Sequence, residues 1–483
     1  MNWRGISWLT GQIFLAFCVT MILPAGWAVW YEEWGSLGSF GAAASVSAGI
    51  GGLMLWRGDS AATLHRREAL VVVGLSWFAL PSIGAIPFIL DGVFASPIDA
   101  LFESVSGFTT TGATVLTEIE TAMSKSVHFW RMQTHWLGGM GIMVLFVAVL
   151  PSIGVGGKML FKNEVPGPIT EGLRPRIRQT SSALWRIYIV LTLVQTVLLM
   201  LFSDMDLWNA SGHAMSTLGT GGFSTMNDSV AGFDSAAVDV IITIFMFLAG
   251  VNFSLYFLVM QGRTTVALKD RELWAYTGLV LVASLVVSAL ILGRHDGHVG
   301  NALRYGFFQV VAIVTTTGFG TDDFDAYPSL ARTVLMLLLF VGGSAGSTAG
   351  GVKIFRFVVM AKSAWTQVRR TFQPQAVTVV KVRGVPIDDG VVRGISAFFF
   401  IYFSLFVIGT VVMSTMSPDL ETAFTSTIAC LGNVGPGLSA VGPTQNYAFF
   451  PPAAKLFLTL LMVFGRLEVF TLLVLFAPAF WRR

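Results

Sequence analysis

Between two long apolar runs the chain reads Thr315-Thr316-Thr317-Gly318-Phe319-Gly320-Thr321. A short helical stretch precedes this segment, and three other places in the sequence show a similar arrangement. Aligned on one glycine each, the four segments centre on Gly112, Gly221, Gly318 and Gly435. The apolar run after each segment contains a further glycine, at Gly139, Gly250, Gly343 and Gly465. One Thr-x-Gly carries no information, but four in the same setting indicate an internal repeat of helix, loop and helix.

The composition places these repeats in a membrane. Of the 483 residues, 54% are hydrophobic and only 12% are charged, against about 25% charged in soluble domains. Apolar runs of bilayer-spanning length predict ten crossings, at 8–30, 37–56, 69–90, 132–151, 183–203, 238–260, 273–293, 333–361, 391–416 and 455–480. We therefore expect an all-α polytopic membrane protein with ten transmembrane helices and four re-entrant pore loops. The composition excludes a secreted disulfide scaffold, a disordered chain and a nucleic-acid-binding domain.

The repeats divide the chain into five parts. Two extra helices are expected over 1–64, followed by pore repeats over 65–155, 156–265, 266–365 and 366–483. Lys and Arg concentrate in one set of loops, for example at Arg66, Arg67, Lys158, Arg369 and Arg370. The positive-inside rule puts that set, and both termini, in the cytoplasm. Acids gather in the opposite loops, which are either ordinary solvated loops or a field that enriches cations at an outer mouth.

The physics of a bilayer narrows the role of the four loops. Backbone that is not helical survives at membrane depth only when it is buried in protein or lines a watery cavity. Four such loops around one axis would form that cavity, and glycine lets each strand turn its carbonyls toward the axis. A ring of carbonyl oxygens can replace the hydration shell of an alkali cation. The alternative is that these glycines serve helix packing or ordinary turns.

The four repeats resemble the Trk/Ktr/HKT superfamily of potassium transporters over essentially the whole chain. The two extra N-terminal spans favour its Trk branch. The resemblance implies that one glycine per repeat anchors a K⁺ selectivity filter and that the residues before it supply further carbonyls. The implied filter residues are Thr110, Thr111, Gly112, Gly219, Thr220, Gly221, Thr316, Thr317, Gly318, Asn433, Val434 and Gly435. In plant members of the superfamily, serine in the first repeat goes with sodium preference, so the resemblance implies that Gly112 favours potassium. It also implies a place in a bacterial inner membrane, and no bound organic cofactor is expected.

The apolar run at 333–361 contains a glycine-rich break. The break consists of Gly342, Gly343, Ser344, Ala345, Gly346, Ser347, Thr348, Ala349, Gly350 and Gly351. Each glycine inside a helix costs about 1 kcal/mol relative to alanine, so the run predicts two helical pieces joined by a loop. The resemblance implies that this loop blocks the pore below the filter as a gate. Close helix packing through small residues is the alternative.

The same stretch matches the G-x-S-x-G pattern of hydrolases at Gly342, Ser344 and Gly346. That pattern needs a preceding strand and a nearby His/Asp pair, and this apolar setting predicts neither. We therefore do not expect an enzyme.

Arg466 lies near the middle of the last expected span, where a charge costs at least about 2.5–3.5 kcal/mol on insertion scales. Glu468 is two residues away and faces another side of the helix, so pairing between the two is not favoured. The resemblance implies that Arg466 lies in the pore below the filter and opposes the passage of cations. The alternative is that Glu468 or the carbonyls of another helix hold it. Lys353 is expected to reach the cytoplasmic surface by snorkelling.

These features predict passive, gated uptake of K⁺, with a symporter coupled to sodium or protons as the alternative. No chain of intramembrane acids supports a second ion site. The resemblance implies a homodimer, and a cytosolic ring of nucleotide-binding regulatory subunits of the TrkA type. The basic inner loops at about 152–182 and 362–390 offer these subunits a docking surface. Membrane lipid is an expected partner and nucleic acid is not.

Overall fold

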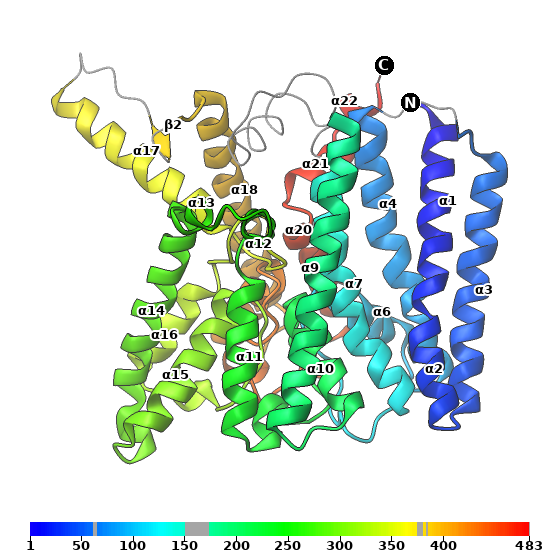
Figure 1. Ribbon diagram of the computed structural model, residues 1–483, viewed down its shortest axis with the longest axis horizontal. Coiled ribbons are helices and arrows are strands. Elements are labelled where there is room, and N and C mark those ends of the chain that lie inside the picture. Colours follow the sequence, from blue (N-terminus) through cyan, green and yellow to red (C-terminus); the bar gives the residue numbers. More distant parts are fainter. Residues whose placement is uncertain (61–64, 150–172, 374–379, 383–384, 483) are drawn as a thin grey trace.

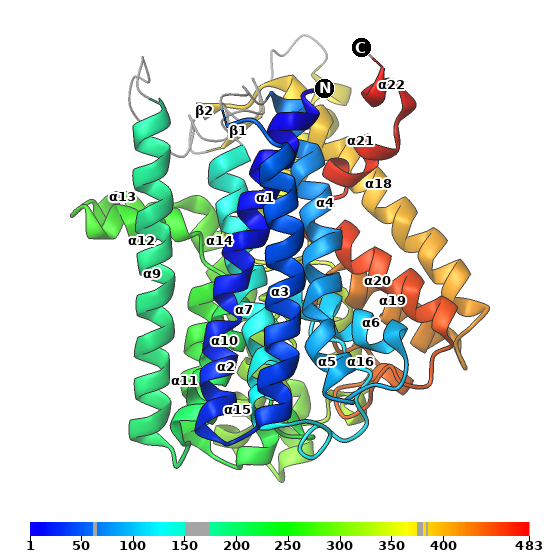
Figure 2. The same cartoon turned by 90° about the vertical axis from the view of Figure 1, so that its right-hand side faces the viewer.

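The computed structural model describes residues 1–60, 65–149, 173–373, 380–382 and 385–482. Within these residues the chain is almost wholly helical, as expected for an all-α polytopic membrane protein. The first three helices lie at one edge of the molecule and pack mainly against one another (Figure 1). They are α1 (Trp3–Thr20), α2 (Ile22–Trp30) and α3 (Trp34–Arg57). Both ends of the chain lie at the same end of the molecule (Figure 2).

The remaining chain alternates long helices with short ones. The first part contains α4 (Arg66–Gly84), α5 (Ile86–Leu90), α6 (Pro97–Phe108) and α7 (Lys125–Val149). The second contains α9 (Leu173–Phe202), α10 (Leu207–Gly219), α11 (Ala236–Ala249), α12 (Phe253–Met260) and α13 (Thr264–Leu268). The third contains α14 (Arg271–Ile291), α15 (Val299–Val314), α16 (Ser329–Leu338) and α17 (Ile354–Phe372). The last contains α18 (Asp389–Ser414), α19 (Leu420–Leu431), α20 (Pro452–Arg466), α21 (Phe470–Phe476) and α22 (Pro478–Trp481).

In the part of the chain that the structure describes, extended pairing consists of one two-stranded sheet and an isolated bridge between Val341 and Val352. The strands of the sheet, β1 (Lys381–Val382) and β2 (Val385–Pro386), are antiparallel, with Lys381 opposite Pro386. Four short 3-10 turns complete the described elements: η2 (Ser229–Phe233), η3 (Leu292–His295), η4 (Phe324–Ala326) and η5 (Ser439–Val441).

Six described helices are long and apolar enough to cross a membrane, and eight spans result if each of two bent helix pairs is one span. The expected span at 132–151 falls on α7 and runs past the described residues. The outward faces of the long helices carry large apolar side chains. On α9 these are Val190, Val194, Val197 and Leu201, at helical spacing, and all are exposed. Such a face suits lipid rather than water.

Two expected spans are not straight helices. The run at 238–260 bends by 90° between α11 and α12, and the run at 455–480 bends by 116° between α20 and α21. In the first, the Gly250 carbonyl accepts a hydrogen bond from the backbone of Ser344, while Asn252 caps α12 through Ser254 N at 2.8 Å. In the second, Glu468 and Val469 have φ of +55° and +52°, which a continuous α-helix does not allow. A segment distant in sequence thus replaces helical hydrogen bonds at the first bend.

The four short helices α6, α10, α15 and α19, called the ring helices below, are each buried over more than half of their residues. The largest hydrophobic core surrounds them and includes Phe102, Val311, Ile313, Ile428 and Leu431. Asp206 and Asp419 cap the N-termini of α10 and α19, and Ser96 caps α6. The fourth ring helix, α15, begins after His298 without a side-chain cap.

Candidate functional site

The ring helices all end in the same way. The left-handed residue after each is Thr110, Thr220, Thr316 or Asn433, with φ between 54° and 57°. In each case that residue donates its N–H to the carbonyl three residues back, as Thr316 does to Ile313. The next residue donates to the carbonyl five residues back, as Thr317 does to Ala312. This Schellman pattern stops the helix and sends the chain away in extended form.

Three of these left-handed residues are threonines. A β-branched residue in that region is a genuine outlier, so tertiary packing holds these turns against a local cost. All four side chains are fully buried. The recurrence of the left-handed turn at all four helix ends shows that the four segments share this turn.

The four segments close into a ring through glycine. Left-handed glycines lie two residues after each of these turns, at Gly112 (φ 78°), Gly222 (80°), Gly318 (74°) and Gly435 (98°). Each lies against a backbone carbonyl of the next segment, so closely that a Cβ on the glycine would overlap sterically with the carbonyl oxygen. That Cβ would lie 2.0 Å from Gly221 O, 2.0 Å from Thr317 O, 2.0 Å from Val434 O and 2.5 Å from Thr111 O, in that order. The last contact returns to the first segment, so the cycle is complete.

The second segment is in a different register from the one expected. The glycine equivalent to Gly112, Gly318 and Gly435 is Gly222, not Gly221. Gly221 stays in the ring, but it supplies the carbonyl that contacts Gly112. Spacing along the sequence cannot tell which of two adjacent glycines is the equivalent one. The backbone decides it, because Gly222 has a positive φ and Gly221 does not. The signal that would have found Gly222 is the next residue, since Gly222-Phe223 matches Gly318-Phe319.

The ring has a distinct environment on each side. The residues that follow the glycines line a cavity of about 70 Å³, which Gly112, Gly222, Gly318 and Gly435 all border. One water needs about 10–15 Å³ measured this way, so the cavity has room for several. On the other side the four helix C-termini meet, and each carries about half a negative charge. The partial negative charge of these helix ends lowers the energy of a positive charge placed between them.

A buried ion pair fixes the chain beyond the first two glycines. Arg131 on α7 binds Glu103 on α6 at 2.6 Å, and both side chains are almost fully buried. The second carboxylate oxygen of Glu103 accepts the N–H of Val115 at 3.0 Å. Arg131 also donates to the carbonyl of Ser224 at 3.1 Å. The pair therefore ties the segment after Gly112 to the segment after Gly222.

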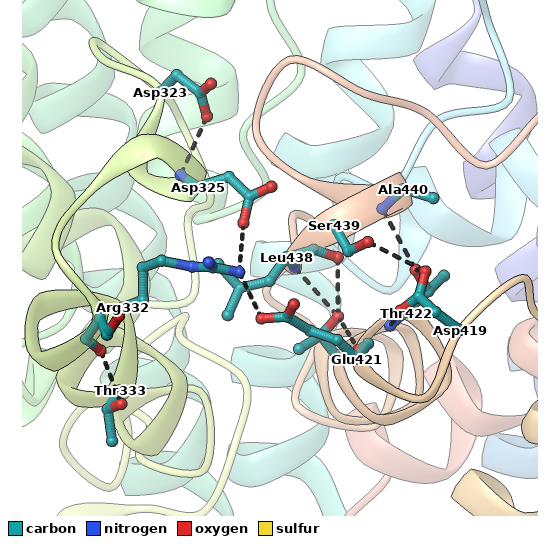
Figure 3. A network of polar contacts seen from close by, with 12 residues as sticks. Asp323, Asp325, Arg332, Thr333, Asp419, Glu421, Thr422, Leu438, Ser439 and Ala440 are labelled. Atoms are coloured by element: carbon teal, nitrogen blue, oxygen red, sulfur yellow. Dashed lines mark hydrogen bonds and ion pairs between the residues drawn. The ribbon is translucent and has the colours of Figure 1, made fainter.

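Further ion pairs join neighbouring segments near the starts of the ring helices. Arg332 on α16 lies between Asp325 at 2.9 Å and Glu421 on α19 at 2.5 Å (Figure 3). Lys455 on α20 binds Asp99 on α6 at 2.7 Å, and Arg304 on α15 lies 3.3 Å from Asp239 on α11. The acid is on a ring helix in the Arg332–Glu421 and Lys455–Asp99 pairs, whereas in the Arg304–Asp239 pair it is on the outer helix α11.

Asp419, beside this network, caps α19 by accepting from Thr422 N at 2.7 Å and Thr422 Oγ1 at 2.8 Å (Figure 3). Ser439 donates to it as well, at 3.1 Å. Slight burial opposes the charge of this carboxylate, but the hydrogen bonds outweigh it and lower the pKa of Asp419. The start of α19 is therefore held by an ionised cap.

The glycine-rich stretch forms a loop between two helical pieces, as its composition predicts. Its neck closes where Gly342 N donates to Val352 O at 2.9 Å and Ile354 N to Gly343 O at 3.2 Å. At its far end, Gly350 N donates to the Thr316 hydroxyl at 2.6 Å. A Cβ on Gly350 would lie 2.7 Å from Cβ of Asn433. The loop therefore contacts two of the four left-handed residues, on the side of the helix ends.

Arg466 is 1% exposed and binds two carbonyls. It donates to Thr348 O in the glycine-rich loop at 2.8 Å and to Gly138 O on α7 at 3.0 Å. Glu468 does not bind it; that carboxylate pairs with Arg356 at 2.6 Å. The charge of Arg466 therefore lies between the loop and α7, without a carboxylate partner in the described part of the chain.

Lys353 differs from expectation. Its side chain is 5% exposed, and its ammonium group donates to the carbonyl of Ala349. Snorkelling is therefore wrong for this residue, because the loop folds back over it and offers a nearer acceptor than the surface does.

Known proteins show the same architecture. A family model named TrkH and described as a cation transport protein matches residues 42–483. The chain belongs to the TrkH family. The Trk system potassium uptake protein TrkH of Salmonella typhimurium is 38% identical over 488 residues and covers 100% of both chains. TrkG of Escherichia coli, also named a Trk system potassium uptake protein, is 32% identical over 99% of both. The crystal structure of the potassium transporter TrkH from Vibrio parahaemolyticus superposes with a TM-score of 0.91, at 35% identity and with full coverage of both chains.

Proposed function

We propose that this TrkH-family chain takes up K⁺ across a bacterial inner membrane, with the ring as its selectivity filter. The observation that carries this proposal is the closed cycle of glycine–carbonyl contacts, because it brings four sets of peptide oxygens to one axis. The names of the full-length relatives support potassium as the ion.

In the proposed mechanism, K⁺ loses its water at the cavity bordered by the four glycines. The carbonyls of Thr111, Gly221, Thr317 and Val434, and those of the four left-handed residues before them, replace the lost hydration. The converging helix C-termini then stabilise the cation electrostatically. Transport is passive and follows the electrochemical gradient. The ion is the transported substrate, and the proposed mechanism involves no organic cofactor.

The loop at 342–351 is proposed as the gate. It lies against Thr316 and Asn433 at the helix-end side of the ring, so an ion that leaves the filter meets it next. Arg466 strengthens the barrier twice, since its positive charge repels the ion and its hydrogen bond to Thr348 holds the loop. Opening then requires the loop to move away from the ring. A deletion within 345–349 should raise K⁺ flux, and an unchanged flux would contradict the gate.

The command to open is proposed to come from outside the chain. Both termini lie at one end of the molecule, which suits a cytoplasmic position for both. The basic residues of α17, Lys362, Arg369 and Arg370, offer a docking surface to a TrkA-type nucleotide-binding subunit. We also propose a homodimer, and the five-part division of the chain given by its repeats.

Growth rescue tests the proposal directly. An uptake-deficient bacterium that expresses the chain should grow at limiting K⁺, and the Gly318→Ser variant should lose preference for K⁺ over Na⁺. Rubidium flux into vesicles, with and without a sodium or proton gradient, then separates passive uptake from symport. Failure of the parent chain to support rubidium flux would refute the proposed function.

A further inference from the structure

The second segment of the ring lacks side chains that the others possess. The residue before the ring glycine is Thr111, Thr317 or Val434 in the other three segments, but it is Gly221 here. In the first and third segments that threonine shares a hydrogen bond of 2.8 Å with the threonine two residues before it. The corresponding residue in the second segment is Gly219, so neither hydroxyl of that pair is present.

His135 of α7 occupies the space of the missing side chains. A Cβ on Gly221 would lie 1.7 Å from His135 Nδ1 and 2.1 Å from Cγ of the same ring. A Cβ on Gly219 would lie 2.5 Å from the His135 carbonyl oxygen. Gly221 is not among the residues with positive φ, so its backbone would accept a side chain, and the three atoms nearest to the added Cβ all belong to the imidazole.

The imidazole is held rigidly on its other side. His135 is fully buried, and its ring meets that of Phe223 edge-on, with centroids 4.1 Å apart. Arg131, one helical turn earlier on the same face of α7, lies 3.5 Å from the centre of the Phe223 ring. Arg131 is fixed in turn by Glu103 and Ser224. One face of α7 thus supports the second segment from Gly219 to Ser224.

Neither ring nitrogen of His135 has a hydrogen-bond partner among the described residues. A buried polar group without a partner is unfavourable, so an apolar side chain would suit an ordinary core position better. The imidazole therefore acts on the second segment through van der Waals contact and not through hydrogen bonds. The residue against which the imidazole lies, Gly221, is also the one whose carbonyl contacts Gly112 of the first segment.

We propose that His135 is a positioning residue for selectivity: its imidazole replaces, from another helix, the side chain that Gly221 lacks, and thereby sets the position of the Gly221 carbonyl. This inference rests on the proposed function, because it assigns a role within that filter. Without the imidazole the second segment can retreat from the axis, and the ring opens between its first and second segments. A wider ring fits K⁺ less closely and discriminates less against Na⁺.

A mutant cycle between the two positions tests this role. His135→Ala alone should remain folded, as judged by a single monodisperse peak in detergent, yet lose K⁺ over Na⁺ preference by about fivefold to tenfold. Gly221→Thr alone should lose transport, because its side chain collides with the imidazole. The double variant gives the second segment the residue of the first and third, so its selectivity should exceed that of either single variant.

Met246→Ala is the matched control. Gly139 and Gly250 hold equivalent places, since each packs against a buried tyrosine hydroxyl and against the residue at the end of a ring helix. Four residues before them lie His135 and Met246, both fully buried. The segment in front of α11 has its own Thr317 side chain, so Met246→Ala should lower thermal stability and leave selectivity intact.

The readouts are rubidium uptake and its competition by sodium in vesicles. A well-folded His135→Ala variant with parental selectivity would overturn the proposal, as would a double variant no better than the worse single one. Loss of selectivity in Met246→Ala to the same extent would also overturn it. If the parent chain itself showed no K⁺-selective flux, the proposed function would fail instead, so the two failures are distinguishable.

Discussion

Gly222→Ala tests the register of the ring. Alanine at φ 80° costs about 1–2 kcal/mol, because its Cβ approaches the following carbonyl. The same Cβ would lie 2.0 Å from the Thr317 carbonyl oxygen, and relieving that overlap adds about 1–3 kcal/mol of repacking. The sum of about 2–5 kcal/mol corresponds to a loss of roughly 30-fold or more in transport or in the population of the closed ring.

Gly320→Ala is the control for this prediction. Gly320 lies two residues after Gly318, its φ is not left-handed, and the nearest atom to an added Cβ would be 3.7 Å away. We expect parental transport from it, since Gly320 is buried but the added methyl group would meet its neighbours only at ordinary van der Waals distance. The assay is initial rubidium uptake in an uptake-deficient bacterium, normalised to membrane expression. A Gly222→Ala variant that transports like the Gly320→Ala variant would refute the ring geometry.

Three further predictions follow from the contacts around the ring. Arg466→Ala should raise K⁺ flux by roughly 2- to 30-fold, because it removes both a positive charge and the hydrogen bond to Thr348. Arg466→Lys keeps the charge and should keep the flux low. Equal flux in the parent and the alanine variant would exclude a role in gating. A double-mutant cycle on Asp239 and Arg304, measured by thermal unfolding, should give a coupling energy of about 0.5–3 kcal/mol, and additive effects would show that the pair does not hold α11 to α15. Asp419→Ala should destabilise the protein by about 0.5–2 kcal/mol through loss of the cap of α19, while Asp419→Asn retains most of the cap. Because the folded pKa of Asp419 is lowered, its contribution is present above the unfolded pKa and is lost as the pH falls through the folded value; a parental melting temperature for the alanine variant at neutral pH would contradict this.

Local pattern predicted more of the fold than of the site. Long apolar runs and sparse charge indicated a polytopic helical protein, since a bilayer imposes length and hydropathy residue by residue. The run of glycines at 342–351 predicted a broken helix for the same kind of local reason. The bends at 250–252 and 467–469 were missed, because the chain is apolar again on both sides of Asn252 and of Arg466 and Glu468, so each run keeps the length of a single span. At the first bend, the compensating hydrogen bond comes from Ser344, almost a hundred residues away.

The site shows the same division more sharply. Recurrence along the chain was sufficient to find four similar loops and three of the four left-handed glycines. It could not choose between Gly221 and Gly222, because the choice depends on which backbone turns left-handed against a carbonyl of the next segment. It gave no reason to single out His135, whose place behind Gly221 exists only once α7 packs against α10.

The amino-acid sequence alone therefore determined the features that depend on neighbours along the chain. These are the helical runs, their polarity, the repeat and the glycine-rich break. Tertiary structure alone decided which carbonyl contacts which glycine, and which carbonyls accept hydrogen bonds from Lys353 and Arg466. It also decided that His135, on a helix of the first segment, packs against the backbone of the second. The physical reason is that a close contact between distant residues depends on the position of every element between them, and no periodicity within a single run encodes that position.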